Sequence, residues 1–313
     1  MRIPLKSADL LSLSFIGLLS ILTVFFIPSL ASWGKILTTY FLLAAAITAL
    51  ALYRKRTALV KSGFYLHTAL TVITILMIFN SLGDLIPGIW SRTFDGVLIR
   101  IDHALFGVHP TVWMERMISP RLTALLQCAY ISYYFIPISF GIVLIAKGKH
   151  DEFEDALFGI VLCFYLSYIG YLLVPAVGPR FTLDHMQTTD LQAGLFIQKI
   201  QSVLNGLEHN KTDAFPSGHT AVALITLYYA WKKKEKVLSA VLLPVALGLI
   251  ISTVYLRYHY VIDVLAGIAL TALTIYLAPK MNTWFSRPSR HPRDQRPPCA
   301  RATPSSPGKR SGP

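Results

Sequence analysis

The sequence has little charge and few cysteines. Asp, Glu, Lys and Arg make up 14% of the 313 residues, 54% are hydrophobic, and the mean hydropathy is +0.53. Soluble domains carry about 25% charged residues, so the soluble globular class is excluded. Cys128 and Cys163 lie within apolar runs and Cys299 near the C-terminus, which argues against a disulfide framework. No HExxH pair, the common zinc-hydrolase motif, is present.

Apolar runs near the roughly 20 residues that a helix needs to cross a bilayer occupy much of the chain. They predict an all-α polytopic membrane protein with about eight transmembrane helices, of which the short sixth is the weakest by hydropathy. The predicted helices lie at about residues 8–30, 34–53, 63–86, 122–146, 153–175, 215–231, 237–256 and 259–279. The first run lacks a small-residue cleavage site, so we expect an anchor helix rather than a signal peptide.

The chain divides into three expected regions. Residues 1–61 form two N-terminal transmembrane helices, and residues 62–285 form a six-helix transmembrane core that carries the polar motifs described below. Residues 286–313 are rich in Pro, Arg and Ser with almost nothing apolar to bury, which predicts a disordered basic tail. A basic cytoplasmic tail needs no nucleic acid to explain it, so we expect no nucleic-acid partner.

Lys and Arg concentrate on one side of this topology, which the positive-inside rule assigns to the cytoplasm. That side receives Arg2 and Lys6, RKR at 54–56, KKKEK at 232–236 and the tail. Both termini are therefore expected to be cytoplasmic. The net charge of +13 is then mostly a consequence of the membrane topology. The loops with unusual polar residues fall on the opposite, outer face: 87–121, 176–214 and 256–260. The short loops suit a bacterial inner membrane.

Segment 87–121 is amphipathic. It mixes Ile, Leu, Phe and Trp with charged residues and histidine at roughly helical spacing, so we expect it to lie in the membrane interface. Two interpretations of Asp95, Asp102, His103 and His109 stay open. These side chains are either solvated or hydrogen-bonded at the headgroup level, or they line a substrate entrance or contact a polar headgroup.

The stretch DAFPSGHTAVAL opens an apolar run with a helix breaker and an imidazole. Pro216 suits a first helical turn, where its missing N–H costs nothing. Ser217 and Gly218 then leave free backbone N–H groups at a helix N-terminus, which is a ready site for a phosphate. His219 is expected to point toward the same place.

A second polar motif lies in STVYLRYHYVIDVLAG, where His259 and Asp263 are four residues apart and hence on one face of the eighth helix. An ionisable group one turn into a transmembrane segment is costly and indicates function. The carboxylate of Asp263 is placed to accept a hydrogen bond from one imidazole nitrogen and leave the other more basic. The fifth helix should stop near Pro175, and Arg180 follows it. Together with Arg257, it brings positive charge to this face.

Two histidines, one backed by a carboxylate, beside a helix N-terminus and two arginines suit phosphoryl transfer. This reaction needs a nucleophile, an acid for the leaving oxygen, and fixed positive charge around the phosphate oxygens. A zinc site on His219, His259 and Asp263 is the competing chemistry. Because the arginines would repel the cation, we expect no metal and no cofactor.

PSGH at 216–219 together with HYVID at 259–263 resembles the type 2 phosphatidic acid phosphatase superfamily of lipid phosphatases and phosphotransferases. Within this superfamily, the inositol phosphorylceramide synthase branch is the most similar to two stretches, TVYLRYHYVIDVLAG and LFGVHPTVW at 105–113. The members of this branch are inositolphosphotransferases. The resemblance covers about residues 100 to 279 and implies a six-helix phosphatase-like core.

The resemblance also implies roles for the motif residues. His259 would be the nucleophile that forms a phosphohistidine, and Asp263 would orient it. His219 would protonate the leaving group and then deprotonate the acceptor. Phosphate would be cradled by Ser217, Gly218 and Arg180, and no metal would be required.

The sequence departs from the superfamily's phosphatases at two points. These carry a Lys, six residues, then Arg-Pro, whereas position 173 is Leu and Arg180 is followed by Phe181. They also carry Ser-Arg six residues before the second histidine, whereas Ser252 is followed by Thr253. We hypothesise that Arg257 replaces the charge of this missing arginine. The synthase branch also lacks that arginine, which favours transfer to an alcohol over hydrolysis.

The leading expectation is therefore a membrane lipid phosphotransferase that moves a phosphoryl headgroup, such as inositol phosphate, to a lipid alcohol on the outer face. The alternative is a lipid phosphate or isoprenyl pyrophosphate phosphatase, which uses the same site with water as the acceptor. A non-enzymatic lipid transporter or scaffold is the third reading. The expected partners are a phospholipid or isoprenyl phosphate, the acceptor and the membrane.

Overall fold

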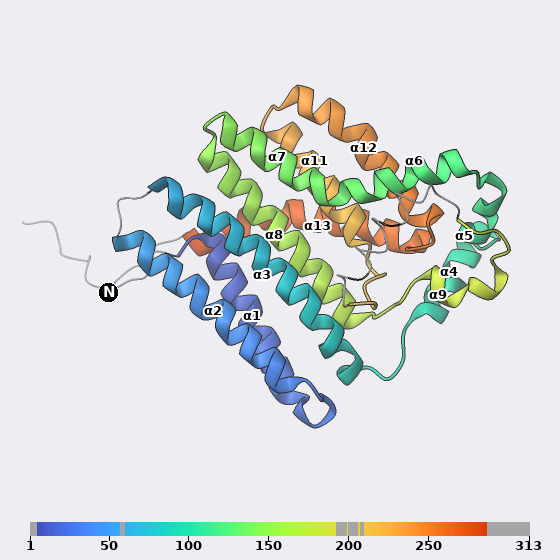
Figure 1. The fold of residues 1–313 in the computed structure, drawn as a ribbon, viewed down its shortest axis with the longest axis horizontal. Coiled ribbons are helices and arrows are strands. Elements are labelled where there is room, and N and C mark those ends of the chain that lie inside the picture. The colour runs from blue at the N-terminus through green and yellow to red at the C-terminus, as the bar shows by residue number, and fades with distance from the viewer. Residues whose placement is uncertain (1–4, 57–59, 192–198, 200–205, 207–209, 287–313) are drawn as a thin grey trace, which may run out of the picture.

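The computed structural model describes residues 5–56, 60–191, 199, 206 and 210–286. Within this part of the chain every regular element is a helix, which confirms the all-α prediction (Figure 1). The α-helices of twelve or more residues are α1 (Ser7–Phe25), α2 (Trp33–Arg56), α3 (Val60–Ile89), α4 (Asp95–Phe106), α6 (Pro120–Ile131), α7 (Phe135–Ala146), α8 (His150–Leu173), α11 (Gly218–Lys232), α12 (Lys236–Tyr255) and α13 (Val261–Ser286). The shorter ones are η1 (Ile27–Ser29), α5 (Pro110–Trp113), η2 (Met114–Met117), η3 (Ser132–Tyr134), α9 (Pro179–Thr182) and η4 (Asp184–Met186).

Seven spans in the described residues are long and apolar enough to cross a membrane, and α6, η3 and α7 together form one of them, Pro120–Ala146. The sixth predicted span is different. Its helix α11 has 15 residues, and a rise of 1.5 Å per residue makes it about 22 Å long, short of a bilayer core of about 30 Å. It packs against α8, α12 and α13, so protein rather than lipid surrounds much of it.

Local sequence explains several helix ends. Pro120 stands at the first position of α6, and the Ser119 hydroxyl before it accepts the N–H of Leu122 as an N-cap. Helix α4 ends at Gly107, which adopts a left-handed conformation with φ of 69° that glycine tolerates best. Helix α8 ends at Leu173, in agreement with a stop near Pro175.

Helix α8 forms the centre of the bundle and contacts α1, α3, α7, α11 and α13. Many of its residues are buried, among them Tyr165, Tyr168 and Tyr171. The Tyr165 hydroxyl donates to Ser12 Oγ at 2.8 Å, and the Tyr168 hydroxyl donates to the Ile75 carbonyl at 3.2 Å. These bonds satisfy polar groups that would otherwise be costly inside an apolar core.

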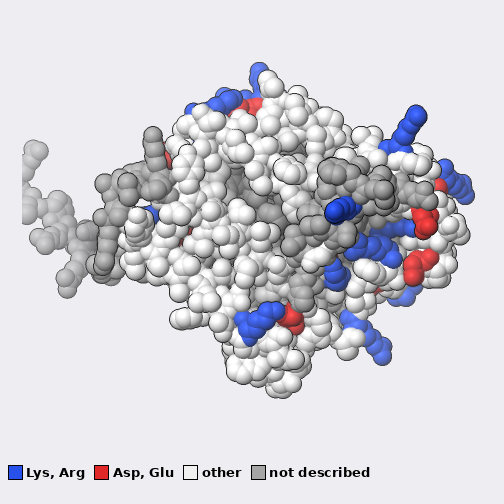
Figure 2. Space-filling view, viewed as in Figure 1, with Lys and Arg blue, Asp and Glu red and all other residues white. Residues whose placement is uncertain are grey.

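The loops rich in Lys and Arg lie at one end of the bundle, and the loops at 174–191, 210–217 and 256–260, which we call the motif loops, lie at the other (Figure 1). At one end, which we call the basic end, ion pairs join Arg54 to Asp9, Lys233 to Asp155, Lys149 to Glu235 and Lys6 to Glu154. At the other, which we call the site end, α4, α5 and α9 gather away from the N-terminus (Figure 1). Figure 2 shows that many charged side chains gather at the site end, with smaller groups at the upper and lower edges of the view and a largely uncharged middle.

The N-terminal helices pack onto the rest of the bundle, α1 against α8 and α13 and α2 against α3. The division at residue 61 and the cytoplasmic location of both termini stay predictions. The proposed tail from residue 287 onward lies outside the described residues.

We predict that Gly267→Ala destabilises the protein by about 1–3 kcal/mol. A Cβ at this position of α13 would lie 2.6 Å from the Ser217 carbonyl oxygen and 3.0 Å from Thr220 Cβ, so α11 would have to shift. Thermal unfolding in detergent measures the loss. Gly17→Ala in α1 is the matched control, because nothing lies within 4 Å of its added Cβ. Equal unfolding temperatures for the two variants would contradict this packing.

Candidate active site

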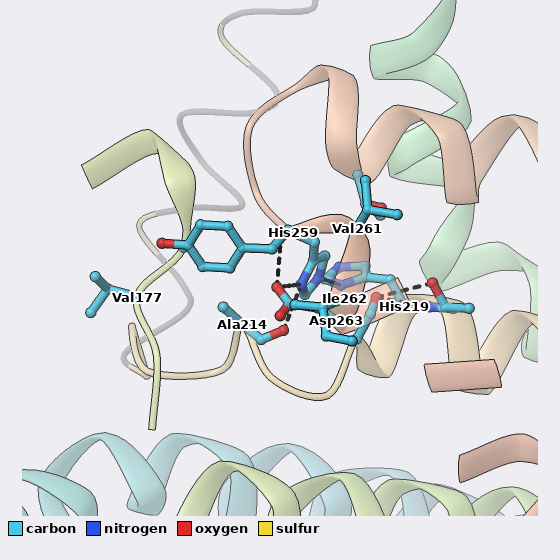
Figure 3. A network of polar contacts seen from close by, with 12 residues as sticks. Val177, Ala214, His219, His259, Val261, Ile262 and Asp263 are labelled. Carbon is cyan, nitrogen blue, oxygen red and sulfur yellow. Dashed lines mark hydrogen bonds and ion pairs between the residues drawn. The ribbon is translucent and has the colours of Figure 1, made fainter. Parts of the chain in front are cut away.

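The structure brings the two motif histidines into direct contact at the site end. His219 lies in the first turn of α11, and His259 lies in the loop between α12 and α13. His219 Nδ1 is 3.1 Å from His259 Nε2 (Figure 3). The pair is therefore one polar unit, although the two residues are 40 positions apart.

The protons on this pair follow from the partner of the second histidine. His259 Nδ1 is 2.7 Å from the Ala214 carbonyl oxygen, which can only accept, so Nδ1 carries the proton (Figure 3). In a neutral imidazole, Nε2 then bears a lone pair, and His219 Nδ1 must donate to it. Among the described residues no hydrogen-bond partner reaches His219 Nε2, which is buried.

Asp263 lies close to the imidazole but is not its hydrogen-bond partner. Its Oδ2 is 3.5 Å from His259 Nδ1 and accepts the Tyr260 N–H at 2.8 Å. The sequence placed both motif residues on the eighth helix, but α13 begins at Val261, so only Asp263 is helical. Its carboxylate caps the start of the helix by binding the N–H three residues earlier, half of a capping box.

Ser217 and Gly218 do not present the row of free N–H groups that the sequence predicted. Helix α11 begins at Gly218, which puts Pro216 before the helix rather than in its first turn. The Ser217 N–H donates to the Asp263 carbonyl at 2.9 Å, and its hydroxyl accepts the Thr220 N–H at 3.3 Å as an N-cap. Ser217 thus joins the starts of α11 and α13.

Arg180 lines the same pocket as the histidine pair. It lies in α9, and its guanidinium carbon lies 4.5 Å from the centre of the Tyr258 ring and 4.7 Å from that of Phe181. Its backbone N–H donates to the Arg257 carbonyl at 2.9 Å. The residues before PSGH also contact the residues before Arg180, because the Ala214 N–H donates to the Ala176 carbonyl at 3.0 Å.

Arg257 does not line this pocket. Its Nη2 donates to Glu115 Oε1 at 2.8 Å and to the Thr189 carbonyl at 2.6 Å, and the side chains of Arg257 and Glu115 are each only 11% exposed. Glu115 also accepts the N–H and the hydroxyl of Thr188. The guanidinium that was expected to replace the missing arginine is thus engaged in an ion pair beside the pocket.

Sequence reasoning missed several residues of the pocket. Besides the histidines and Arg180, its wall includes Tyr130, Tyr258, Asn210, Lys211 and Asp213. The Tyr130 ring stacks on Tyr258 with centroids 4.3 Å apart and lies 4.9 Å from the His219 ring. Lys211 and Asp213 lie a few positions before PSGH, and this closeness to the motif is the sequence signal that indicates them.

The aspartates of the outer segment are buried rather than solvated. Asp95 and Asp102 are 3% and 1% exposed and accept backbone N–H groups of the motif loops. Of the possibilities that the sequence left open, hydrogen bonding rather than solvation describes these two aspartates. His103 and His109 pack ring against ring on α4 and the start of α5, with centroids 5.0 Å apart.

The electrostatics of the site favour a neutral His259. Burial lowers the pKa of its imidazole from 6.5 to about 4, although Asp213 and the Ala214 carbonyl act in the opposite direction. No group of three or more His, Cys, Asp or Glu side chains in the described residues is arranged to hold a metal ion. The arrangement is a neutral imidazole with its lone pair beside a second imidazole and near a guanidinium.

Fold and site together define an all-helical integral membrane protein with a histidine pair at one end of its bundle. A sequence profile of the PAP2 superfamily matches residues 97–277. Because this is more than half of the chain, the protein belongs to the PAP2 superfamily, whose members are phosphatases and phosphotransferases.

Two curated proteins are similar to this chain. The PA-phosphatase related-family protein of Dictyostelium discoideum is 26% identical, over 66% of this chain and 44% of the relative. The phosphoinositol dihydroceramide synthase of Bacteroides thetaiotaomicron is 29% identical, over 46% of this chain and 51% of the relative. The chain thus spans about half the length of the curated relatives it matches. No solved structure gives a significant match.

We predict that His259 stays neutral until the pH falls through about 4, because burial disfavours the charged imidazole. Between about pH 6.5 and 4 the unfolded chain takes up a proton that the folded chain does not, so stability decreases as the pH falls through this window. An NMR titration of ¹⁵N-histidine-labelled protein in micelles measures the pKa of His259. The His259 signals are assigned by their loss in His259→Asn. Protonation with a midpoint near pH 6.5 would contradict the prediction.

A second prediction concerns Arg257. Because Arg257→Met leaves Glu115 nearly buried without its cation, we expect a loss of about 3 kcal/mol. The double variant with Glu115→Gln should regain stability and keep the substrate KM of the unaltered protein. Unfolding and steady-state kinetics of both single variants and the double variant measure this. A tenfold rise in KM that persists in the double variant would place Arg257 in the phosphate site after all.

Proposed function

We propose that the protein is a membrane lipid phosphotransferase that works through a phosphohistidine on His259. The observation that carries this proposal is the Ala214 carbonyl on Nδ1, because it leaves Nε2 as a lone-pair nitrogen at the pocket. Membership of a superfamily of phosphatases and phosphotransferases supports the same chemistry.

In the first step, the Nε2 lone pair of His259 attacks the phosphorus atom of the lipid phosphoester. The bond between phosphorus and the lipid oxygen breaks, and that oxygen takes a proton from His219, which acts here as an imidazolium. Entry of the phosphate separates the two rings, because their hydrogen bond occupies the attacking lone pair. The negative charge of the phosphate favours the protonated form of the second ring.

In the second step, neutral His219 takes the proton of the acceptor hydroxyl, and the acceptor oxygen attacks phosphorus. The bond between nitrogen and phosphorus breaks, which restores the His259 lone pair. Asp263, 3.5 Å from Nδ1, stabilises the positive charge that the imidazole bears while it is phosphorylated. Each histidine ends the cycle in its starting state.

The phosphate oxygens are proposed to bind Arg180, which lines the pocket beside the histidine pair. Arg180 is held in place by Tyr258, so its positive charge is fixed before substrate arrives. Lys211 adds a second cation to the pocket wall. Arg257 is left out of this set because its guanidinium is bound to Glu115.

The acceptor is proposed to be a lipid alcohol, and the transferred group a phosphoryl headgroup such as inositol phosphate. The similarity to a phosphoinositol dihydroceramide synthase supports this choice. The rings of Tyr130 and Tyr133 lie 4.9 and 4.4 Å from the His219 ring, and we propose that they favour a lipid alcohol over water as the acceptor. The similarity to a PA-phosphatase related protein supports hydrolysis as the second candidate. The site is proposed to face the outer side of a bacterial inner membrane.

We predict that purified protein in lipid nanodiscs moves radiolabelled inositol phosphate from phosphatidylinositol to an added lipid alcohol. Phosphatidic acid and an isoprenyl pyrophosphate are tested in parallel, each with and without ceramide or diacylglycerol. Product that forms only with the alcohol supports transfer. Release of water-soluble phosphate without any alcohol would instead support a phosphatase.

Histidine variants test the covalent step in the same assay. His259→Ala should lose turnover and acid-labile protein phosphorylation, with an effect of at least 100-fold, because the nucleophile is gone. His185→Ala is the matched control, since that exposed histidine lies on the same end of the molecule in η4. Full activity in monodisperse His259→Ala would remove the phosphohistidine mechanism and favour a transporter or scaffold.

A further inference from the structure

Helix α4 carries two buried carboxylates on one face. Asp95 is its first residue and Asp102 lies seven positions later, which is about two helical turns or 10 Å along the axis. Both are almost fully buried, at 3% and 1% exposed. A buried ionised side chain is costly unless it is fully hydrogen-bonded, so what each one binds matters.

Asp95 binds the loop that leads to Arg180. Its Oδ1 accepts the Gly178 N–H at 2.9 Å, and its Oδ2 accepts the Val177 N–H at 3.1 Å. The Tyr260 hydroxyl also donates to Oδ1 at 2.9 Å. These bonds hold the two residues that precede α9, and thereby fix where the helix with the pocket arginine begins.

Asp102 binds the start of the helix that follows the nucleophile. Its Oδ2 accepts the Val261 N–H and its Oδ1 accepts the Ile262 N–H, both at 2.8 Å. Figure 3 shows Val261 and Ile262 next to the histidine pair. The first backbone N–H groups of a helix have no partner within the helix, so a carboxylate here fixes the helix start.

We infer that Asp95 and Asp102 are positioning residues, and that α4 sets the distance between the phosphate-binding Arg180 and the nucleophile His259. Each carboxylate binds two consecutive backbone N–H groups, which restricts rotation as well as distance. A helix is stiff over two turns, so neither loop shifts without the other. The inference rests on the proposed function, because that function gives the two loops their different roles.

The two residues act on different steps, which separates positioning from a general loss of stability. Asp102→Ala frees the start of α13 beside His259, so kcat should fall about 10- to 100-fold with KM within about twofold. Asp95→Ala frees the loop before Arg180, so KM should rise about tenfold with a smaller change in kcat. The Asn variants keep one accepting oxygen and should give smaller changes in the same directions.

The experiment measures steady-state kinetics of the full chain in nanodiscs, corrected for the folded fraction by size-exclusion chromatography. The affinity for inorganic phosphate is measured by calorimetry, and Asp95→Ala should weaken it while Asp102→Ala leaves it unchanged. Asp184→Ala is the control, because that carboxylate is exposed at the same end of the molecule. If an Ala variant fails to fold, its Asn variant replaces it.

The outcomes distinguish this inference from the proposed function. If His259→Ala is inactive but both aspartate variants keep the kcat and KM of the unaltered protein per folded molecule, the positioning inference is overturned. Equal changes of kcat and KM in the two variants also overturn it. If no phospholipid is turned over, the proposed function fails, and the phosphate affinities alone decide whether Asp95 positions Arg180.

Discussion

The start of α13 must satisfy its backbone N–H groups inside a largely apolar protein, where each unsatisfied group costs several kcal/mol. Two carboxylates meet this requirement. Asp263 accepts the N–H of Tyr260, and Asp102 accepts those of Val261 and Ile262. The loop with His259 is therefore fixed at its C-terminal side by a fully hydrogen-bonded helix start.

The start of α11 depends on this same point. Ser217 donates its N–H to the backbone carbonyl of Asp263, and Gly267 lets the two helices approach without a side chain between them. His219 is then carried to within 3.1 Å of His259. The close contact of the two imidazoles is thus a consequence of helix packing and backbone hydrogen bonding, more than of any attraction between the rings.

The need to pair buried polar groups also explains how charge is distributed at the site end. The outer segment contributes Asp95, Asp102 and Glu115, and each is bound to a backbone or guanidinium group of a motif loop. Arg257 is neutralised by the last of these, whereas Arg180 lies over an aromatic ring at the pocket. The two arginines therefore differ in role: Arg257 holds loops together, and Arg180 lies in the pocket with the histidine pair.

Much of this was predictable from sequence, and the reason is physical. Long apolar runs have to form helices in a bilayer, so hydropathy located the spans, and the spacing of basic residues predicted that the motif loops share one end. The length of α11 was misjudged because Phe215 and Pro216 are apolar and extend the run without being helical. The ion pair of Arg257 was not predictable, because sequence does not show that Glu115, 142 residues away, pairs with it.

The sequence by itself determined the all-α membrane fold and the PSGH and HYVID motifs, because hydrophobic periodicity and residue type are local properties. Only the tertiary structure decided which atoms surround His259. Its Nδ1 partner is the backbone carbonyl of Ala214, and a carbonyl has no signature in the sequence because every residue carries one. Which carbonyl, and which distant aspartate, reaches the site depends on how helices far apart in the chain pack together.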